Sequence, residues 1–283
     1  MDEILNQIVA AAEANVQIDS TDYELDGRMY CGKCHTPKES ILNWMGHERK
    51  VPCLCRCASE ARKAELEERK QQEELDRLAR IRSVGMSDRT QWESTFDNAD
   101  GRNAEYLSFC KEYCDSWPQM YKENIGMLLW GGVGTGKSYA AACIANEILD
   151  HHHAEVMMTN FSRVLKGLFS AENKNQYIED LVKYPLLIID DLGVERSNEY
   201  TMEQVYGVID ARYRTKKPLI VTTNIPLSEL QEPGDIAHER IYSRVLEMCM
   251  PVDFGDGDSR ADRAEKKWAR AKEIMRGGNQ NGD

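Results

Sequence analysis

The stretch MLLWGGVGTGKS, residues 127–138, joins an apolar run to a glycine-rich loop, and it decides the fold of the chain. The loop itself, residues 131–138, matches the phosphate-binding pattern GxxxxGK[ST]. The apolar run predicts a strand, and the residues after the loop, SYAAACIANEIL, predict a helix. Backbone N–H groups and the helix dipole then converge on one anion-sized space. A simple glycine turn would need neither Lys137 nor Ser138, so the stretch predicts a nucleotide site.

The same loop predicts which groups would hold the nucleotide. Lys137 would reach the β- and γ-phosphates, and the Ser138 hydroxyl would bind Mg²⁺. Both belong to a set of binding residues that runs through the loop into the helix. Its members are Gly132, Val133, Gly134, Thr135, Gly136, Lys137, Ser138 and Tyr139. The expected cofactors are therefore ATP or ADP with Mg²⁺.

Beyond about residue 84, short apolar runs alternate with helical patterns. Strands are predicted at Gly126–Trp130, Glu155–Thr159, Leu186–Asp190, Leu219–Thr223 and Met248–Asp253. Helices are predicted at residues 137–150, 160–182, 199–215 and 235–246. This alternation indicates an α/β domain in which helices cover both faces of a parallel sheet.

Two carboxylates end the third predicted strand. Residues 186–191, LLIIDD, are four aliphatic residues followed by Asp190 and Asp191, a pattern typical of a central strand that delivers acids to the carboxyl edge of a parallel sheet. Adjacent carboxylates repel without a cation, and the Mg²⁺ of a nucleotide would be that cation. Asp190 would hold it through water, and Asp191 would orient or deprotonate the attacking water. Taken alone, the stretch is also compatible with a strand ending in a polar turn.

Further polar groups follow the fourth predicted strand. Asn224 can hydrogen-bond a γ-phosphate or the water beside it, although Asn before Ile225-Pro226 is also typical of a turn. The stretch HERIYSR then places Arg240 and Arg244 four residues apart on one helical face. An arginine at the γ-phosphate neutralises charge in the transition state, and a neighbouring molecule can supply it.

Cysteines gather near the N-terminus. The chain has nine, an odd number, and five lie between residues 31 and 57, which argues against a disulfide framework and for a metal site or free thiols. A four-thiolate zinc site needs two pairs of cysteines brought together by a loop. The predicted zinc ligands are Cys31, Cys34, Cys55 and Cys57, with Cys53 as the alternative and His35 and His47 close enough to substitute. Reduced free thiols remain the competing interpretation.

Composition excludes several classes of protein. The net charge of -12 and pI of about 5.1 exclude non-specific nucleic-acid binding through bulk charge. Mean hydropathy is -0.60, and no apolar run approaches the roughly 18 residues that span a bilayer, which excludes an integral membrane protein. The N-terminal residues lack the basic start of a secretory signal, so the cytoplasm is the expected location.

Any DNA contact must therefore be local. One candidate set mixes an aromatic ring with cations after the second strand, although a buried helix would give the same pattern. It comprises Phe161, Ser162, Arg163 and Lys166. A second is a basic cluster that is either a solvated helix end or a phosphate contact. It comprises Arg212, Arg214, Lys216 and Lys217.

The composition divides the chain into four parts. Residues 1–57 are the cysteine module. Near its start, Ile4, Leu5, Ile8, Val9 and Ala12 stand at helical spacing and predict a short amphipathic helix followed by an acidic loop. Residues 58–84 form a charged linker helix, either a spacer or a partner-binding face. Residues 85–255 are the nucleotide-binding domain. Residues 256–283 are a C-terminal helix, at 261–276, with a disordered tail.

Together, GGVGTGKS, LLIIDDLG, IVTTN and HERIYSR resemble an AAA+ ATPase, a P-loop NTPase with a three-layer αβα domain. More narrowly, residues 209–224 (IDARYRTKKPLIVTTN) are similar to the stretch found in replicative-helicase loaders of the DnaC/DnaI type and in related IstB-like transposition ATPases. The resemblance covers residues 85–255. It implies a sheet with the strand before the phosphate loop at its centre and the TTN strand between that strand and the acidic one.

The resemblance also implies roles. Asn224 would be sensor I, Arg240 the arginine finger acting on the next subunit, and Arg244 a second candidate. Asp191 departs from the family, because many AAA+ proteins carry Glu there, which puts the vigour of hydrolysis in doubt. No separate helical lid is evident after Phe254, so the sequence assigns no sensor arginine on a lid. Arg260 is named only as a guess.

The function implied is that of an ATP-hydrolysing loader that places a hexameric replicative helicase on single-stranded DNA. Its zinc module would grip the helicase, ATP would drive self-assembly, and hydrolysis or exchange would release the helicase. One alternative is a transposition ATPase that coats duplex DNA. Another is a zinc-organised protein that holds nucleotide without turnover.

Overall fold

The structure is a computed structural model that describes residues 18–44, 47–99, 101, 104–193, 199–257, 264–265, 267–271 and 275. The helix expected near the N-terminus lies outside the described residues, as does part of the expected C-terminal helix. Residues 264–265 and 267–271 of that helix are helical. The chain divides into two compact units, Met1–Asp76 and Arg77–Asp283.

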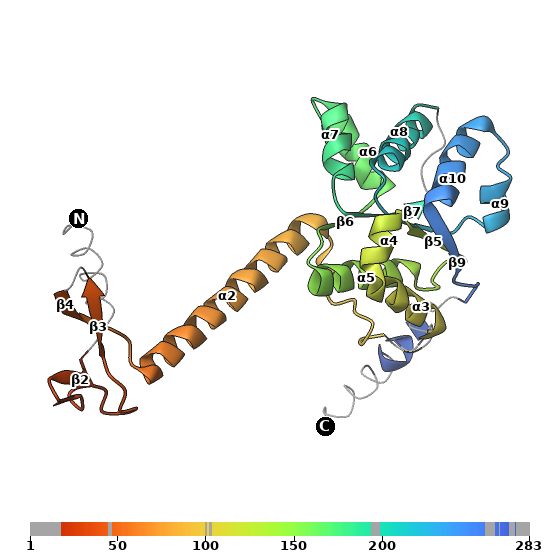
Figure 1. Ribbon diagram of the computed structural model, residues 1–283. Coiled ribbons are helices and arrows are strands. Elements are labelled where there is room, and N and C mark those ends of the chain that lie inside the picture. Colours follow the sequence, from red (N-terminus) through yellow and green to blue (C-terminus); the bar gives the residue numbers. More distant parts are fainter. Residues whose placement is uncertain are drawn as a thin grey trace, which may run out of the picture. The chain divides into compact units, whose positions relative to one another are not determined.

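A five-stranded parallel sheet forms the centre of the second unit (Figure 1). Its strands are β5 (Gly126–Trp130), β6 (Val156–Asn160), β7 (Leu186–Leu192), β8 (Leu219–Thr223) and β9 (Cys249–Asp253). They pair in the order β6-β7-β8-β5-β9, and every neighbouring pair is parallel. The predicted strands are present, and β8 lies between β7 and β5 as expected. The middle strand is β8 rather than the expected β5, because β6 and β7 lie on one side of β8 and β5 and β9 lie on the other.

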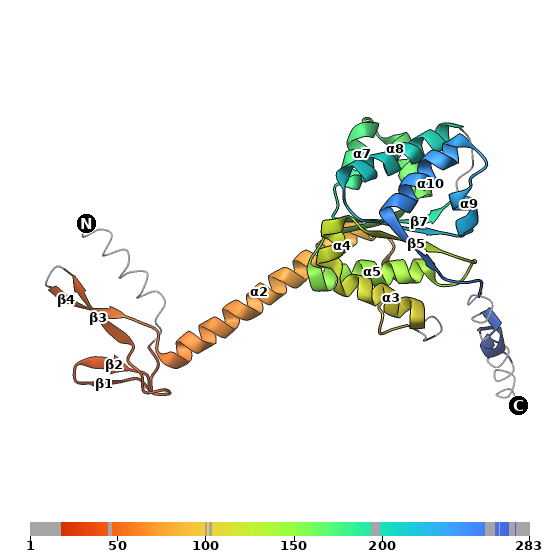
Figure 2. The same cartoon turned by 45° about the vertical axis from the view of Figure 1, so that its right-hand side comes forward.

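Helices cover both faces of this sheet, as the alternation predicted (Figure 2). One layer holds α3 (Ala104–Asp115), α4 (Trp117–Glu123) and α5 (Lys137–His152). The other holds α6 (Phe161–Ser170), α7 (Lys174–Val182), α8 (Glu199–Thr215), α9 (Leu227–Gln231) and α10 (Ile236–Met248). Successive side chains of β5 explain the two layers. Met127 and Leu129 pack in the first apolar cluster and Leu128 in the second, because strand side chains alternate between faces.

The largest difference from the predicted helices lies at residues 160–182. The single helix expected at residues 160–182 is two helices, α6 and α7. Ala171 adopts an extended backbone after α6, and the Asn173 side chain then accepts a hydrogen bond from the Gln176 N–H at 3.2 Å to begin α7. Helices α3, α4 and α9 were not predicted at all, since their short apolar patterns carry little periodic signal.

Arg212 is neither a solvated residue nor a phosphate contact, so both expectations for it were wrong. Its side chain is fully buried, and the guanidinium donates to the carbonyls of Val182, Tyr184, Pro185 and Pro218. The first three carbonyls lie between the end of α7 and the start of β7, and that of Pro218 lies just before β8. Burial lowers the pKa of Arg212 to about 10, so the side chain stays charged at neutral pH. Arg212 therefore fastens α8 to the amino edge of the sheet.

The first unit consists of two small antiparallel hairpins and the start of a long helix. The hairpins are β1 (Tyr23–Leu25) with β2 (Arg28–Tyr30), and β3 (Glu39–Trp44) with β4 (His47–Pro52). Sequence reasoning predicted neither. A buried ion pair between Lys38 and Asp22 holds the region around the cysteines, and it lowers the pKa of Asp22 to about 2.

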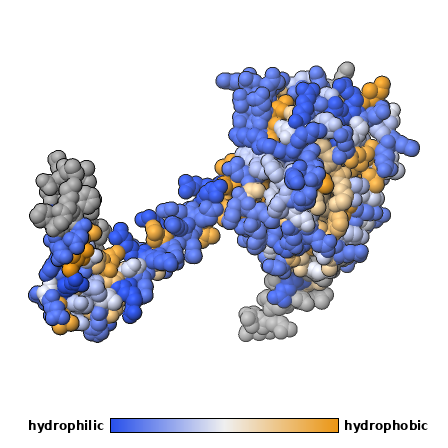
Figure 3. Space-filling view, viewed as in Figure 1, coloured by the Kyte–Doolittle hydropathy of each residue, from blue (hydrophilic) through white to orange (hydrophobic). Residues whose placement is uncertain are grey.

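Helix α2 (Arg56–Gly85) begins in the first unit and ends in the second. Most of its surface is hydrophilic, as the charged linker predicted (Figure 3). Leu78 and Gly85 near its end are buried, and Arg82 pairs with Asp150 of α5. Among the described residues, no helix is both long and apolar enough to cross a membrane.

Candidate functional site

The phosphate-binding loop joins β5 to α5, as predicted. Gly131 has φ +136°, and a Cβ there would lie 2.7 Å from the Gly255 carbonyl oxygen, so only glycine fits. The Gly132 N–H donates to that same carbonyl at 2.7 Å, which ties the loop to the residues after β9. The Lys137 ammonium donates to the Gly131 and Gly132 carbonyls at 2.9 and 2.6 Å. The loop is thus closed around a buried lysine that can exchange carbonyls for phosphate oxygens.

The other predicted binding residues occupy distinct places around this loop. Val133 is 55% exposed at its tip, whereas Thr135 is buried and its hydroxyl donates to the Gly132 carbonyl at 3.0 Å. Ser138 is half-buried in the first turn of α5. The Tyr139 hydroxyl donates to the Thr95 carbonyl at 2.8 Å, so this side chain anchors the segment after α2.

The segment after α2 is fastened to the helix of the phosphate loop. It includes a short 3₁₀ helix, η1 (Arg89–Gln91). The Asn146 amide of α5 donates to the carbonyls of Gln91 and Ser94, each at 2.9 Å. Sequence analysis did not identify Asn146, because a single polar residue in an apolar helix gives no signal of its partner.

Asp190 and Asp191 lie in a β-bulge at the end of β7. Ile189 pairs with Val221 and Leu192 pairs with Thr223, so both aspartates stand opposite the single residue Thr222. Asp191 adopts the left-handed backbone, with φ +59°. Asp190 is half-buried and Asp191 is exposed. The strand therefore continues two residues beyond its predicted end, and a bulge delivers the acids.

The predicted catalytic groups of β5, β7 and β8 meet at one edge of the sheet. Trp130 of β5 pairs with Thr223 of β8, and each is the last residue of its strand. The phosphate loop and Asn224 therefore begin beside each other. Asn224 is exposed at this edge. Because the strands are parallel, the two aspartates end at the same edge. Carboxylate, amide and hydroxyl oxygens suit Mg²⁺, and Lys137 suits phosphate.

The two predicted finger arginines lie on α10 but are held differently. The Arg240 guanidinium stacks on the Tyr206 ring of α8, 4.2 Å from its centroid, and is exposed. Arg244 also lies over Tyr206, but its Nε pairs with Asp210 at 3.1 Å and its Nη2 donates to the Tyr206 hydroxyl at 3.0 Å. Arg244 is thus engaged within its own chain, and Arg240 is the more accessible cation.

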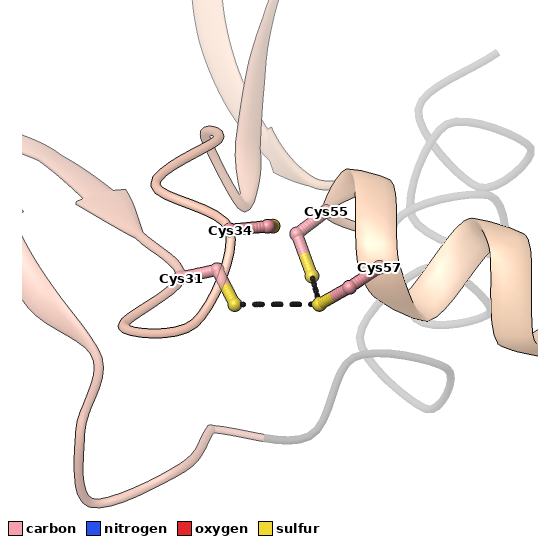
Figure 4. Close-up of side chains that lie close together, drawn as sticks. All are labelled: Cys31, Cys34, Cys55 and Cys57. Carbon is pink, nitrogen blue, oxygen red and sulfur yellow. Dashed lines mark hydrogen bonds between the residues drawn. The ribbon is translucent and has the colours of Figure 1, made fainter.

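In the first unit, the structure brings together the four cysteines that were predicted as ligands (Figure 4). The Sγ atoms of Cys31, Cys34, Cys55 and Cys57 all lie within 4.8 Å of one another. Cys57 Sγ lies 3.6 Å from Cys31 Sγ and 3.4 Å from Cys55 Sγ. A tetrahedral zinc with bonds of about 2.3 Å separates its sulfurs by about 3.8 Å, so the cluster fits zinc.

The alternative ligands are placed elsewhere. The Cys53 Sγ faces the Pro37 carbonyl at 3.8 Å rather than the cluster. The His35 ring contacts the Tyr23 hydroxyl at 3.2 Å. The side chain of His47 lies outside the described residues.

The thiols of the cluster titrate unequally. The Thr36 hydroxyl and the Cys57 backbone N–H lower the pKa of Cys34 to about 5. Hydrogen bonding to Cys55, Cys34 and Cys31 raises the pKa of Cys57 to about 12. Four thiolates this close together would repel one another, and a divalent cation bound between them would offset that repulsion.

An exposed aromatic pair on the second unit was missed by sequence analysis. Phe169 of α6 and Tyr200 of α8 are 62% and 40% exposed, with ring centroids 5.6 Å apart. The Lys174 ammonium donates to the Tyr200 hydroxyl at 2.7 Å. Phe161, which the sequence offered either as a DNA-contacting ring or as part of a buried helix, is buried with Val164 and Leu168, as the second interpretation predicted. The spacing of those three residues marks the buried stripe of α6, and Phe169 lies outside it.

Comparisons with known proteins agree with this architecture. A family model described as IstB-like ATP binding protein matches residues 57–266. The replicative helicase loader DnaC of Escherichia coli (strain K12) is 28% identical over 144 residues, 49% of this chain and 56% of DnaC. The replicative helicase loader DnaI of Bacillus subtilis (strain 168) is 25% identical over 182 residues, 59% of this chain and 58% of DnaI.

The matched regions span a little over half the length of both relatives. A solved structure of DnaI superposes with a TM-score of 0.52 at 18% identity, covering 63% of this chain and 98% of that one. The likeness supports the same α/β fold for the second unit.

Proposed function

Because the chain belongs to the family of IstB-like ATP-binding proteins, we propose that it is an ATP-dependent loader that binds a hexameric replicative helicase and places it on single-stranded DNA. The names of two relatives, both replicative helicase loaders, support this role. The observation that carries the proposal is the exposed pair of Phe169 and Tyr200 beside Lys174. Unpaired bases stack on such rings, whereas duplex bases are already stacked on one another.

ATP would bind at the carboxyl edge of the sheet. Lys137 would release the loop carbonyls and bind the β- and γ-phosphates, and Ser138 with Asp190 would hold Mg²⁺. The metal, when bound, neutralises charge that develops on the phosphates. Asp191 would orient or deprotonate the attacking water, and Asn224 would contact the γ-phosphate.

Arg240 would complete the site of a neighbouring subunit. Its guanidinium is exposed and stacked on Tyr206, so it can leave the ring for a γ-phosphate across a subunit contact. ATP binding would then drive self-assembly, and hydrolysis would weaken it. The two states differ by contacts to the γ-phosphate, which is what makes the nucleotide a switch.

The first unit would dock on the helicase. Zinc bound by Cys31, Cys34, Cys55 and Cys57 would order this small module, which has little apolar core of its own. The hairpins near the cluster expose several large apolar side chains that offer apolar surface to a protein partner. They are Tyr23, Leu25, Ile41 and Leu42, each 37–51% exposed.

Binding of single-stranded DNA tests the role of the exposed rings of Phe169 and Tyr200. We expect Tyr200→Ala to weaken binding of a fluorescent oligothymidine about tenfold in ATP, since one stacked base is worth roughly 1–3 kcal/mol. Phe109→Ala, which removes an exposed ring from α3, is the matched control and should change nothing. Fluorescence anisotropy measures both. Equal binding of duplex and single strands, unaffected by Tyr200→Ala, would favour the duplex-coating alternative.

Docking is tested by the mass in solution of the chain mixed with the host's hexameric helicase. Light scattering with ATP and retained zinc should show a discrete complex. Substituting both Ile41 and Leu42 by Asp should abolish it, because charge on the hairpin opposes apolar docking. Leu75→Asp alters a leucine of α2 that is 61% exposed, more than Ile41 or Leu42, and should leave the complex intact. A complex that survives the double substitution would place docking elsewhere.

Zinc is tested by metal analysis of the full chain. The wild type and Cys53→Ser should each retain about one zinc per chain after dialysis against a weak chelator, because the Cys53 sulfur faces away from the cluster. Cys55→Ser removes a predicted ligand and should lose the metal. Mass spectrometry of the native proteins gives the count. Zinc loss in Cys53→Ser but not in Cys55→Ser would reverse the ligand assignment.

Arg240→Ala should leave ATP affinity unchanged but lower turnover by about 10³-fold, the lower end of an arginine finger's contribution. ATP-driven assembly should be lost as well. The control Arg214→Ala removes an exposed arginine that pairs with Asp210, and it should behave as wild type. Phosphate release and light scattering report the two effects. A fully active, normally assembling Arg240→Ala protein contradicts the finger assignment.

A further inference from the structure

One buried hydroxyl connects both aspartates of the nucleotide site. Thr222 of β8 is fully buried. Its Oγ1 donates to the Asp190 carboxylate at 2.6 Å and accepts the backbone N–H of Asp191 at 2.9 Å. A threonine hydroxyl has one donor and two acceptor positions, so both bonds can form together. The orientation of one acid and the backbone of the next are therefore coupled through a single atom.

The geometry around Thr222 explains why such a connection matters. Asp190 and Asp191 face Thr222 across the bulge, where the regular ladder between β7 and β8 is interrupted. Asp191 also carries the left-handed backbone, with φ +59°, which costs energy for a residue other than glycine. The bond from its N–H to Thr222 offsets part of that cost. The bond thereby stabilises the bulge conformation in which both Asp190 and Asp191 lie at the carboxyl edge of the sheet.

We propose that Thr222 is a positioning residue for ATP hydrolysis. Its hydroxyl fixes the Asp190 carboxylate for Mg²⁺ and the Asp191 backbone for the attacking water. The inference rests on the proposed hydrolysis and on the roles given there to the two acids. Thr222 is fully buried and its hydroxyl already bonds to the Asp190 carboxylate and the Asp191 N–H, so the role proposed for it acts through these two acids and not through contact with the nucleotide.

The neighbouring residue provides a matched control. Thr223 is equally buried, and its hydroxyl also makes two hydrogen bonds. It donates to the Leu192 carbonyl at 2.8 Å and accepts the Ile225 N–H at 3.1 Å. Neither bond involves an aspartate. Replacing either threonine by valine removes one buried hydroxyl of β8, so any general loss of stability should be similar.

The experiment compares Thr222→Val, Thr222→Ser and Thr223→Val in the full chain. We expect Thr222→Val to lower kcat by about 10- to 100-fold, as loss of a group that orients a metal ligand commonly does, while the Kd for ATP changes less than about twofold. Thr222→Ser keeps the hydroxyl and should restore most of the turnover. Thr223→Val should lower kcat much less than Thr222→Val does, because its hydroxyl bonds to neither aspartate, and in thermal unfolding it should resemble Thr222→Val.

A second readout is the Mg²⁺ concentration that half-saturates the effect of the metal on ATP binding. Thr222→Val should raise it about tenfold and Thr223→Val should not, because only Thr222 contacts the carboxylate assigned to the metal. If the wild type releases no phosphate under any condition, the proposed hydrolysis fails, and the Mg²⁺ titration alone decides the role of Thr222. Equal Mg²⁺ responses in the two valine variants would overturn the inference, as would equal kcat values in an active enzyme.

Discussion

The parallel alignment of β7, β8 and β5 is the constraint on which the site depends. Each strand ends in a different chemical group, and parallel pairing brings those ends to one edge of the sheet. Pairing of Trp130 with Thr223 sets the phosphate loop beside Asn224. An antiparallel β8 would carry Asn224 to the opposite edge, next to the carbonyls that Arg212 binds. Local motifs alone would not make a site without this register.

Much of this arrangement could be predicted because its signals are local. The glycines and lysine of residues 131–138 define a loop without reference to any other part of the chain, and four aliphatic residues before Asp190 define a buried strand. The bulge could not be predicted in this way. It arises from the pairing of β7 with β8, where Thr222 faces two residues, and nothing in the sequence distinguishes Thr222 from Thr223.

The same distinction explains the other differences from the sequence analysis. The cysteine spacing predicted four ligands, since two close pairs are a local feature, and only the fold shows that Cys53 faces the Pro37 carbonyl. Arg212 lies in a basic stretch of sequence that is typical of a solvated helix end. Its burial depends on carbonyls outside α8, which the local sequence does not indicate. Phe169 and Tyr200 meet only after α6 and α8 pack together. Tertiary contacts decide these cases.

The two arginines of α10 differ in how strongly each is held within the chain, and this difference supports the proposed choice of Arg240 as the finger. A finger must leave its resting partner for a phosphate, so a weak resting contact is an advantage. Stacking of an exposed cation on an aromatic face is worth about 0.5–1 kcal/mol, a small cost for Arg240 to lose. Arg244 would also have to break an ion pair with Asp210 and a hydrogen bond to the Tyr206 hydroxyl.

Arg244 also supports the ring on which Arg240 rests. Because Arg244 donates to the Tyr206 hydroxyl and packs on the same ring, it holds Tyr206 in place beneath Arg240. The pair therefore divides into a fixed support and a movable cation.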